Sequence, residues 1–182
     1  MKKVIIYIAM SLDGYIADKN GGVAFLGGDG TDTEDMGSYN DFYDTVSEVI
    51  MGYTTYNQIV TELAPDNYPY SGRKSYVLTT KNLVDKDDII FTKKSIPEII
   101  SELKTSESKG NIWINGGASI VNQVLKFGLF DEIVVSVIPT ILGSGINLFQ
   151  TMDTQIRLKL VSTQSYNGIV ELKYVPNIEV LN

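Results

Sequence analysis

The chain contains 182 residues, of which 43% are hydrophobic and 20% are charged, and it carries a formal net charge of −7. These proportions are typical of a globular protein and predict a single domain over residues 1–182, while the acidic balance argues against nucleic acid or an anionic membrane as partner. Cysteine and histidine are both missing from the sequence, which excludes disulfides, thiolate or histidine metal sites and imidazole catalysis. Chemistry in this chain therefore depends on carboxylates, hydroxyls, lysines, backbone groups, water or an organic cofactor.

The first predicted strand covers residues 4–9, an apolar run that ends just before the turn-forming residues 11–14. This run is too short and too rich in β-branched residues for a secretory signal peptide. No apolar run in the sequence approaches the roughly 20 residues that a membrane helix needs. We therefore expect a cytoplasmic protein without a membrane partner.

Further strands follow along the chain. A short extended piece at residues 15–17 precedes a loop rich in glycine and aspartate. Short buried strands are then predicted at residues 76–78 and 89–91, and also at 49–51, 112–114 and 133–138. Two final strands, at residues 158–166 and 169–175, flank Asn167-Gly168, which is the strongest short signal for a β-hairpin.

Helical patterns separate these strands. Thr31 and Glu34 are spaced like a capping box and predict the start of a first helix. Its apolar positions are Met36, Tyr39, Phe42, Tyr43 and Val46. The apolar positions of a second helix are Tyr56, Ile59, Val60 and Leu63. A third helix begins at Ser95 with Pro97 in its first turn, and a fourth covers residues 118–127 and ends at Gly128.

The alternation of strands and helices predicts an α/β fold. We expect one mostly parallel, mixed sheet of about seven or eight strands, covered by roughly four helices on its two faces. The C-terminal hairpin adds an antiparallel edge to this sheet. An exposed edge with apolar side chains invites pairing with another copy, so we predict a homodimer. The apolar positions of the hairpin are Leu158, Leu160, Val170, Leu172 and Tyr174.

Small and polar residues follow three of the predicted strands. In open α/β sheets, ligands bind beyond the carboxyl ends of parallel strands. The three segments are Gly52-Tyr53-Thr54-Thr55, Thr79-Thr80-Lys81 and Asn115-Gly116-Gly117-Ala118-Ser119. Each alone is compatible with an ordinary turn, and Thr54 or Thr55 could simply cap a helix. Together, at one edge of one sheet, they predict a site for a phosphate-bearing ligand at helix starts. Neither a G-x-G-x-x-G fingerprint nor a P-loop is present.

Several motifs resemble a known family. Residues 8–17, 51–56 and 115–117 resemble the dihydrofolate reductase superfamily in order and spacing. Residues 131–133, 139–145 and 148–149 are similar to the reductase domain of the bifunctional riboflavin-biosynthesis deaminase–reductase and to its free-standing relatives. The resemblance spans nearly the whole chain. It implies a three-layer α/β/α fold and NADPH-dependent hydride transfer to a small heterocyclic or sugar-like carbonyl or imine, similar to that of 5-amino-6-(5-phosphoribosylamino)uracil reductase.

The resemblance also implies three groups of cofactor-binding residues. Those expected to border the nicotinamide are Ala9, Ile16 and Ala17. Those expected at the pyrophosphate are Gly52, Tyr53, Thr54 and Thr55 from one helix start, and Gly116, Gly117, Ala118, Ser119 and Ile120 from the other. Those expected near the adenosine ribose and its 2′-phosphate are Thr79, Thr80 and Lys81. The glycine pair resembles the family's Gly-Gly, which is often joined by a cis peptide bond.

The cofactor and the catalytic group stay less defined. The family usually has arginine where this chain has Tyr53, so NADH is not excluded as the cofactor. Dihydrofolate reductases carry a carboxylate on the first helix, and the matching position lies near Ser38. Asp35 is the nearest carboxylate before it and Asp41 lies one turn after it. The candidate proton donor is Asp35, another nearby carboxylate or bound water. Asp13 is a candidate substrate contact or a structural turn residue, and Tyr39 is a candidate substrate contact or a core residue. The acidic run at residues 29–35 lacks the spacing of a calcium loop, and we expect no metal.

Two other functions remain open at this point. One is a true dihydrofolate reductase. The other is a dinucleotide-binding protein that has lost catalysis. In each case the expected partner is a small molecule.

Overall fold

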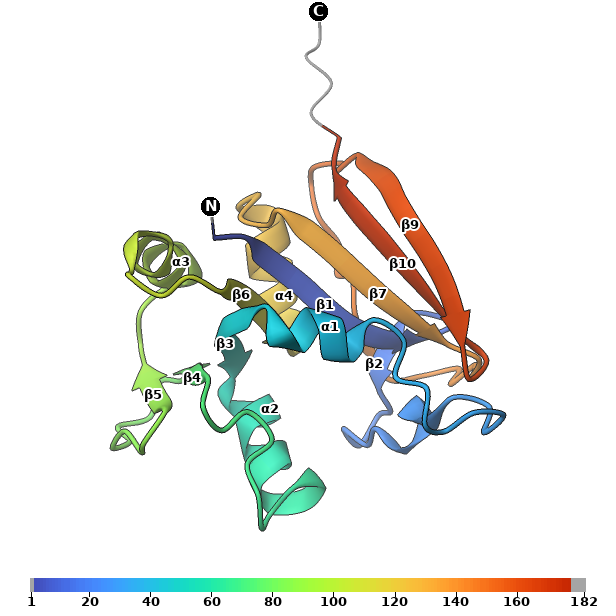
Figure 1. Ribbon diagram of the computed structural model, residues 1–182, viewed down its shortest axis with the longest axis horizontal. Helices are drawn as coiled ribbons and strands as arrows, with labels where there is room; N and C mark the ends of the chain where they lie inside the picture. Colours follow the sequence, from blue (N-terminus) through green and yellow to red (C-terminus); the bar gives the residue numbers. More distant parts are fainter. Residues whose placement is uncertain (1, 178–182) are drawn as a thin grey trace, which may run out of the picture.

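A central sheet organises the molecule. The computed structural model describes residues 2–177. Eight strands lie in the order β5-β4-β3-β6-β1-β7-β10-β9, with β5 and β9 at the two edges (Figure 1). The bounds are β1 Val4–Ser11, β3 Val46–Gly52, β4 Lys74–Leu78, β5 Ile89–Thr92, β6 Asn111–Gly116, β7 Glu132–Ile138, β9 Leu158–Tyr166 and β10 Ile169–Pro176. Two short strands, β2 (Tyr15–Ala17) and β8 (Ile146–Asn147), pair separately.

The pairing confirms the predicted mixed sheet. The strands from β5 to β7 run parallel to their neighbours, whereas β10 is antiparallel to β7 and to β9. The turn between β9 and β10 is formed by Asn167 and Gly168, whose φ angles are 45° and 72°. Positive φ at both central residues defines the tight hairpin turn that Asn-Gly favours.

Helices cover both faces of this sheet and confirm the three-layer α/β/α architecture. They are α1 (Tyr39–Asp44), α2 (Tyr53–Gln58, continued by the π-helical turn η2, Ile59–Leu63), α3 (Ile96–Thr105) and α4 (Ala118–Lys126). A short 3₁₀ helix, η1, covers Ala24–Gly27. Figure 1 shows α1 in front of the sheet and α4 behind it.

The residues of β1 show why two layers of helix are needed. Val4 and Ile6 pack into the core under α3 and α4, whereas Ile5 and Tyr7 point to the opposite face and pack with residues of α1 and α2. Successive side chains of a strand point to opposite faces, so a strand that is apolar throughout must be covered on both sides. All four side chains are buried.

The third helix starts after the predicted cap, and the fourth ends just before the predicted Gly128. The Ser95 backbone N–H donates to a carboxylate oxygen of Glu98 at 2.8 Å, closing a capping box at the start of α3, with Pro97 in the first turn. Gly128, just after α4, has a φ of 63°, the left-handed conformation that ends many helices.

The prediction for the first helix was wrong at both ends. No helix begins at Thr31, because the aspartates before and after it bind the backbone locally. Asp29 accepts from the Thr31 N–H at 3.0 Å, and Asp35 accepts from the Gly37 N–H at 2.8 Å. Residues 31–38 therefore contain turns and no helix. Val46, the last expected helical position, is the first residue of β3 and is buried.

Candidate functional site

A cavity of about 1400 Å³ opens along the carboxyl edge of the parallel strands. Its wall includes the ends of β1, β3, β4, β6 and β7, the starts of α2 and α4, and parts of the loop between β2 and α1. This is the edge at which open α/β sheets bind ligands. The predicted convergence of the three strand-end segments is therefore observed.

Two helix starts face each other in the wall of this cavity. The N-cap residues of α2 and α4 are Gly52 and Gly117, which have no side chain to accept from the first-turn N–H groups. A Cβ atom placed on Gly117 would lie 3.3 Å from Thr55 Oγ1, and one on Gly52 would lie 3.5 Å from Ile120 Cγ1. The two helix starts are thus in contact range, and their first-turn N–H groups are free of side-chain caps, as an anion site requires.

The glycine pair has the expected geometry. The Gly116–Gly117 peptide bond is cis. Gly117 lies on the cavity wall, with Ala118, Ser119 and Ile120 beside it. Gly116 lies behind the wall, where it is buried against Ile8 with a φ of 129°.

The predicted threonine cap of α2 is not formed. The helix begins at Tyr53 with Gly52 as its N-cap, which places Thr54 and Thr55 inside the first turn. Both threonines nevertheless line the cavity. The Thr55 hydroxyl lies close to Gly117 across the gap between the two helices.

The middle of the cavity is bordered by small and apolar side chains. Ala9, Ile16 and Ala17 all lie on its wall. Asp13 lies outside the wall and has a structural contact instead: its carboxylate accepts from the Ser11 hydroxyl at 2.6 Å and from the N–H groups of Leu142 and Gly143 at 3.1 and 2.7 Å. The Ser11 hydrogen bond first, and then these backbone bonds, lower the pKa of Asp13. Asp13 thus joins two loops beside the cavity.

Three lysines gather at one end of the cavity. Thr79, Thr80 and Lys81 line this end together with Lys93 and Lys94, which follow β5. The Lys81 Nζ lies 4.0 Å from the centroid of the Tyr53 ring, a cation–π contact. Lys81 thus places a cation beside the position at which the family has arginine.

The other two lysines differ in their contacts. The Lys94 Nζ donates to both carboxylate oxygens of Glu102, at 2.7 and 2.8 Å. The Lys93 Nζ donates to the neutral Asn82 Oδ1 at 2.6 Å. Lys93 therefore keeps a positive charge that no carboxylate offsets within residues 2–177. Sequence reasoning missed both lysines, although their place directly after a parallel strand could have revealed them.

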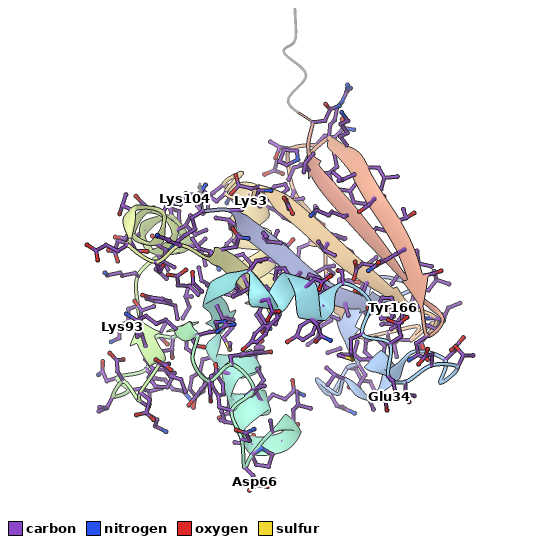
Figure 2. All side chains as sticks on the ribbon, viewed as in Figure 1. Lys3, Glu34, Asp66, Lys93, Lys104 and Tyr166 are labelled. Carbon is purple, nitrogen blue, oxygen red and sulfur yellow. The ribbon has the colours of Figure 1, made fainter. Side chains whose placement is uncertain are left out.

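Hydroxyl and carboxyl groups line the opposite end. Tyr7, Tyr39, Ser136 and Tyr166 all lie on the wall there, as does Asp35, an exposed residue. Burial first, and then the neighbouring Glu171, raise the pKa of the Tyr7 hydroxyl far above its usual value. Figure 2 labels Lys93 and Tyr166, which lie on opposite sides of the molecule and mark the two ends of the cavity.

A buried carboxylate stands behind this end. Glu171 on β10 is 5% exposed. It accepts hydrogen bonds from the hydroxyls of Tyr7 and Ser38, both at 2.6 Å, and from the Gln164 side chain at 2.9 Å. On the neighbouring strand β7, the buried Ser136 Oγ has no hydrogen-bond partner among residues 2–177. Sequence reasoning missed this network, because β10 was recognised only as an edge strand.

Residues 2–177 contain no cluster of three or more acidic side chains placed to hold a metal ion. In the same part of the chain, no helix has both the length and the apolar character needed to cross a membrane.

The fold and the position of the cavity define a protein of the dihydrofolate reductase-like class. Residues 2–170 match the model of the RibD C-terminal domain family. The chain belongs to this family, which confirms the resemblance seen in its motifs. It is 36% identical over 175 residues to the uncharacterized protein YwjB of Bacillus subtilis (strain 168), covering 96% of this chain and 98% of that protein.

Solved structures agree with this assignment. A putative riboflavin biosynthesis protein from Shewanella sp. PV-4 is 25% identical with a TM-score of 0.85, covering 96% of this chain and 99% of that one. Two more distant structures show the fold alone. One is the Thermotoga maritima diaminohydroxyphosphoribosylaminopyrimidine deaminase/5-amino-6-(5-phosphoribosylamino)uracil reductase, at 14% identity and a TM-score of 0.70, covering 97% of this chain and 57% of that one. The other is an Enterococcus faecalis dihydrofolate reductase complexed with NADP(H), at 16% identity and 0.68, covering 96% of each chain.

Proposed function

We propose that this protein is an NADPH-dependent reductase that transfers hydride to a small heterocyclic or sugar-like carbonyl or imine. The observation that carries the proposal is the contact between two helix starts without side-chain caps, at Gly52 and Gly117, in the wall of a cavity that continues past β1. Backbone N–H groups at helix starts bind phosphate oxygens. Membership of the RibD C-terminal domain family supports the same reaction class.

The residues along the cavity are suited to a dinucleotide bound in one particular orientation. The pyrophosphate would meet the helix starts at Gly52 and Gly117, and the nicotinamide would lie against Ala9 and Ile16. A bound dihydronicotinamide supplies the hydride. The chain's own residues would bind both partners, hold them in order and exclude water from the apolar middle of the cavity.

The lysines favour NADPH over NADH. Lys81 and Lys93 lie at the end of the cavity where the adenosine would be, next to the hydroxyls of Thr79 and Thr80. A 2′-phosphate placed there would receive charge-assisted hydrogen bonds from both ammonium groups. NADH has no such phosphate, so it would leave these cations without an anionic partner.

Asp35 is the proposed proton donor. Its carboxyl lies on the wall at the end of the cavity beyond Ala9, on the side away from the lysines. A proton could reach the reduced substrate from this carboxyl or from a water molecule that it holds. In α1 the side chain on the cavity wall is Tyr39, while Asp41 and Asp44 lie elsewhere, and this arrangement disfavours a true dihydrofolate reductase.

Replacing Asp35 with asparagine should lower kcat by about 100-fold or more, because general acid catalysis contributes roughly 10²–10⁴ in rate. Dinucleotide affinity should stay unchanged. The measurement is the loss of dihydronicotinamide absorbance with a panel of pyrimidine, pteridine and sugar-like substrates, including dihydrofolate. Asp44→Asn, on the exposed side of α1, is the control. Equal rates for Asp35→Asn and the native protein would remove Asp35 from the mechanism, and failure of the whole panel despite NADPH binding would favour the catalytically inactive alternative.

We also propose a homodimer that forms through β9. This edge strand is exposed from Leu158 to Ser165, and its apolar residues Leu158, Leu160 and Val161 are 38%, 49% and 53% exposed. A second copy would pair its own β9 antiparallel to the first and cover both sets of open backbone groups. Leu160→Lys should therefore give a monomer by light scattering. Leu83→Lys, in the loop between β4 and β5, should leave the dimer intact. A monomeric native protein would contradict the proposal.

A further inference from the structure

The charges that line the cavity are divided between its ends. Every lysine or arginine on its wall, within residues 2–177, lies at the end near β4 and β5: Lys81, Lys93 and Lys94. At the opposite end, Asp35 lies on the wall and Glu171 lies buried behind Tyr7. In Figure 2, Glu34 and Tyr166 lie on the same side of the molecule, far from Lys93. A ligand that spans the cavity would meet cations at one end and carboxylates at the other.

The partners of Glu171 are all neutral in the described part of the chain. They are the hydroxyls of Tyr7 and Ser38 and the amide of Gln164. The charge of this buried carboxylate is therefore not cancelled by a nearby cation. Burial raises the pKa of the Tyr166 hydroxyl most, the neighbouring Ser136 hydroxyl lowers it, and the charges of Glu171 and Asp35 raise it further. An anionic group beside Tyr166 would be repelled by the same two carboxylates.

Most backbone N–H groups of the loop at residues 29–37 already donate hydrogen bonds within the protein. A phosphate can bind without cations if several backbone N–H groups point at it. In the loop that borders this end, the Asp29 N–H donates to the Asn167 carbonyl, and the Asp32 N–H donates to the Asn167 side chain. The N–H groups of Thr31, Glu34, Asp35 and Gly37 donate to aspartate side chains of the same loop. The loop therefore offers few free donors to an anion.

What this end does offer is acceptors. Ser136 lies on the cavity wall, and its buried Oγ has no hydrogen-bond partner in the part of the chain described. Asp35 adds a carboxylate on the same wall. An amino group or a ring N–H would satisfy both, because each can accept a hydrogen bond. A phosphate has only acceptor oxygens and negative charge, so it could accept from the Ser136 hydroxyl but would be repelled by the Asp35 carboxylate.

We infer that the substrate of this protein carries no phosphate group and is a neutral or cationic heterocycle that presents N–H donors to Ser136 and Asp35. The inference rests on the proposed function, since it concerns the substrate end of the same cavity. It separates this chain from the Thermotoga maritima protein, whose name includes a 5-phosphoribosylamino substrate. All phosphate groups in the cavity then belong to the dinucleotide: the pyrophosphate at the two helix starts and the 2′-phosphate at the lysines.

The first test titrates inorganic phosphate into protein that is already saturated with NADP⁺. Saturation is measured beforehand by calorimetry, and its failure would count against the proposed function rather than against this inference. We expect no saturable phosphate binding to the loaded protein at millimolar concentrations. A saturable second site that perturbs NMR signals of residues around Tyr166 would overturn the inference.

The second test compares a matched pair of ligands on the same NADP⁺-loaded protein. The pair is 5-amino-6-(5-phosphoribosylamino)uracil and the same compound without its phosphate. We expect the dephosphorylated compound to bind at least about ten-fold more tightly, which corresponds to about 1.4 kcal/mol. Equal or tighter binding of the phosphorylated compound would contradict the inference.

Two variants sharpen this comparison. Thr33 is exposed and lies on the cavity wall at the carboxylate end, so Thr33→Lys should improve binding of the phosphorylated compound by about ten-fold. Thr105→Lys adds the same charge at the exposed end of α3, outside the cavity, and should change the affinity for neither ligand. An unchanged preference in Thr33→Lys would show that charge at this end does not control substrate choice.

Discussion

Replacing Gly117 with valine is expected to weaken NADPH binding by about ten- to one hundred-fold. A Cβ atom at this position would lie 3.3 Å from Thr55 Oγ1 and 3.7 Å from Ile16 Cδ1, and all three residues line the cavity. The added methyl groups would occupy the space in which a pyrophosphate can reach the helix N–H groups. Overpacking a filled site costs roughly 1–3 kcal/mol, and each 1.4 kcal/mol is about a factor of ten in affinity. Calorimetric titration with NADPH measures the change.

Gly27→Val is the matched control for this variant. Gly27 also lines the cavity, but a Cβ atom there would have no heavy atom of the described chain within 4 Å beyond its immediate neighbours. It lies in η1, away from both helix starts. We expect its NADPH affinity to stay close to that of the native protein, with thermal unfolding of both variants measured alongside. Native-like binding by a folded Gly117→Val protein would mean that the pyrophosphate does not lie between α2 and α4.

Replacing Lys81 or Lys93 with glutamine should weaken NADPH binding by about ten-fold each and leave NADH binding almost unchanged. A hydrogen bond to a charged group contributes roughly 1.5–3 kcal/mol, and both side chains are exposed, so solvent screening favours the lower value. The preference of the native protein for NADPH should fall as salt is added. The measurement is the ratio of the two dissociation constants for each variant.

Lys94→Gln provides the control. Lys94 lines the same end of the cavity, but its ammonium is already paired with Glu102 at 2.7 Å. Removing it should therefore change NADPH affinity much less than removing Lys81 or Lys93. Parallel losses of NADPH and NADH binding in the Lys81 and Lys93 variants would show that these lysines do not read the 2′-phosphate.

Local signals in the sequence were sufficient for most of the fold. Asn167-Gly168 identified the hairpin because that dipeptide adopts positive φ at both positions. Ser95, Pro97 and Glu98 identified the start of α3 because capping depends on nearby residues. The prediction of the first helix start was wrong because local signals competed. Thr31 and Glu34 have capping-box spacing, but the aspartates around them accept hydrogen bonds from the backbone instead.

The site was predictable where strand ends defined it. Gly52, Thr79 and Gly117 come together because parallel neighbouring strands end at one edge of the sheet. The contact between Tyr7 and Glu171 at the opposite end was not predictable, since these residues are 164 positions apart and meet only through the order of β1, β7 and β10. Single-sequence patterns reveal which residues share an element, but not which distant elements become neighbours.

A dinucleotide bound in this cavity would lie along the carboxyl edge of the sheet, past the cavity wall. Trp113 is the single tryptophan of the chain and lies on the cavity wall. Exciting it while NADPH is titrated tests this claim directly, because energy transfer to a dihydronicotinamide requires the two groups to be close. We predict sensitised dihydronicotinamide emission that saturates with NADPH and is reversed by excess NADP⁺. Absence of both sensitised emission and binding heat, with NADPH and with NADH, would contradict the assignment of this cavity.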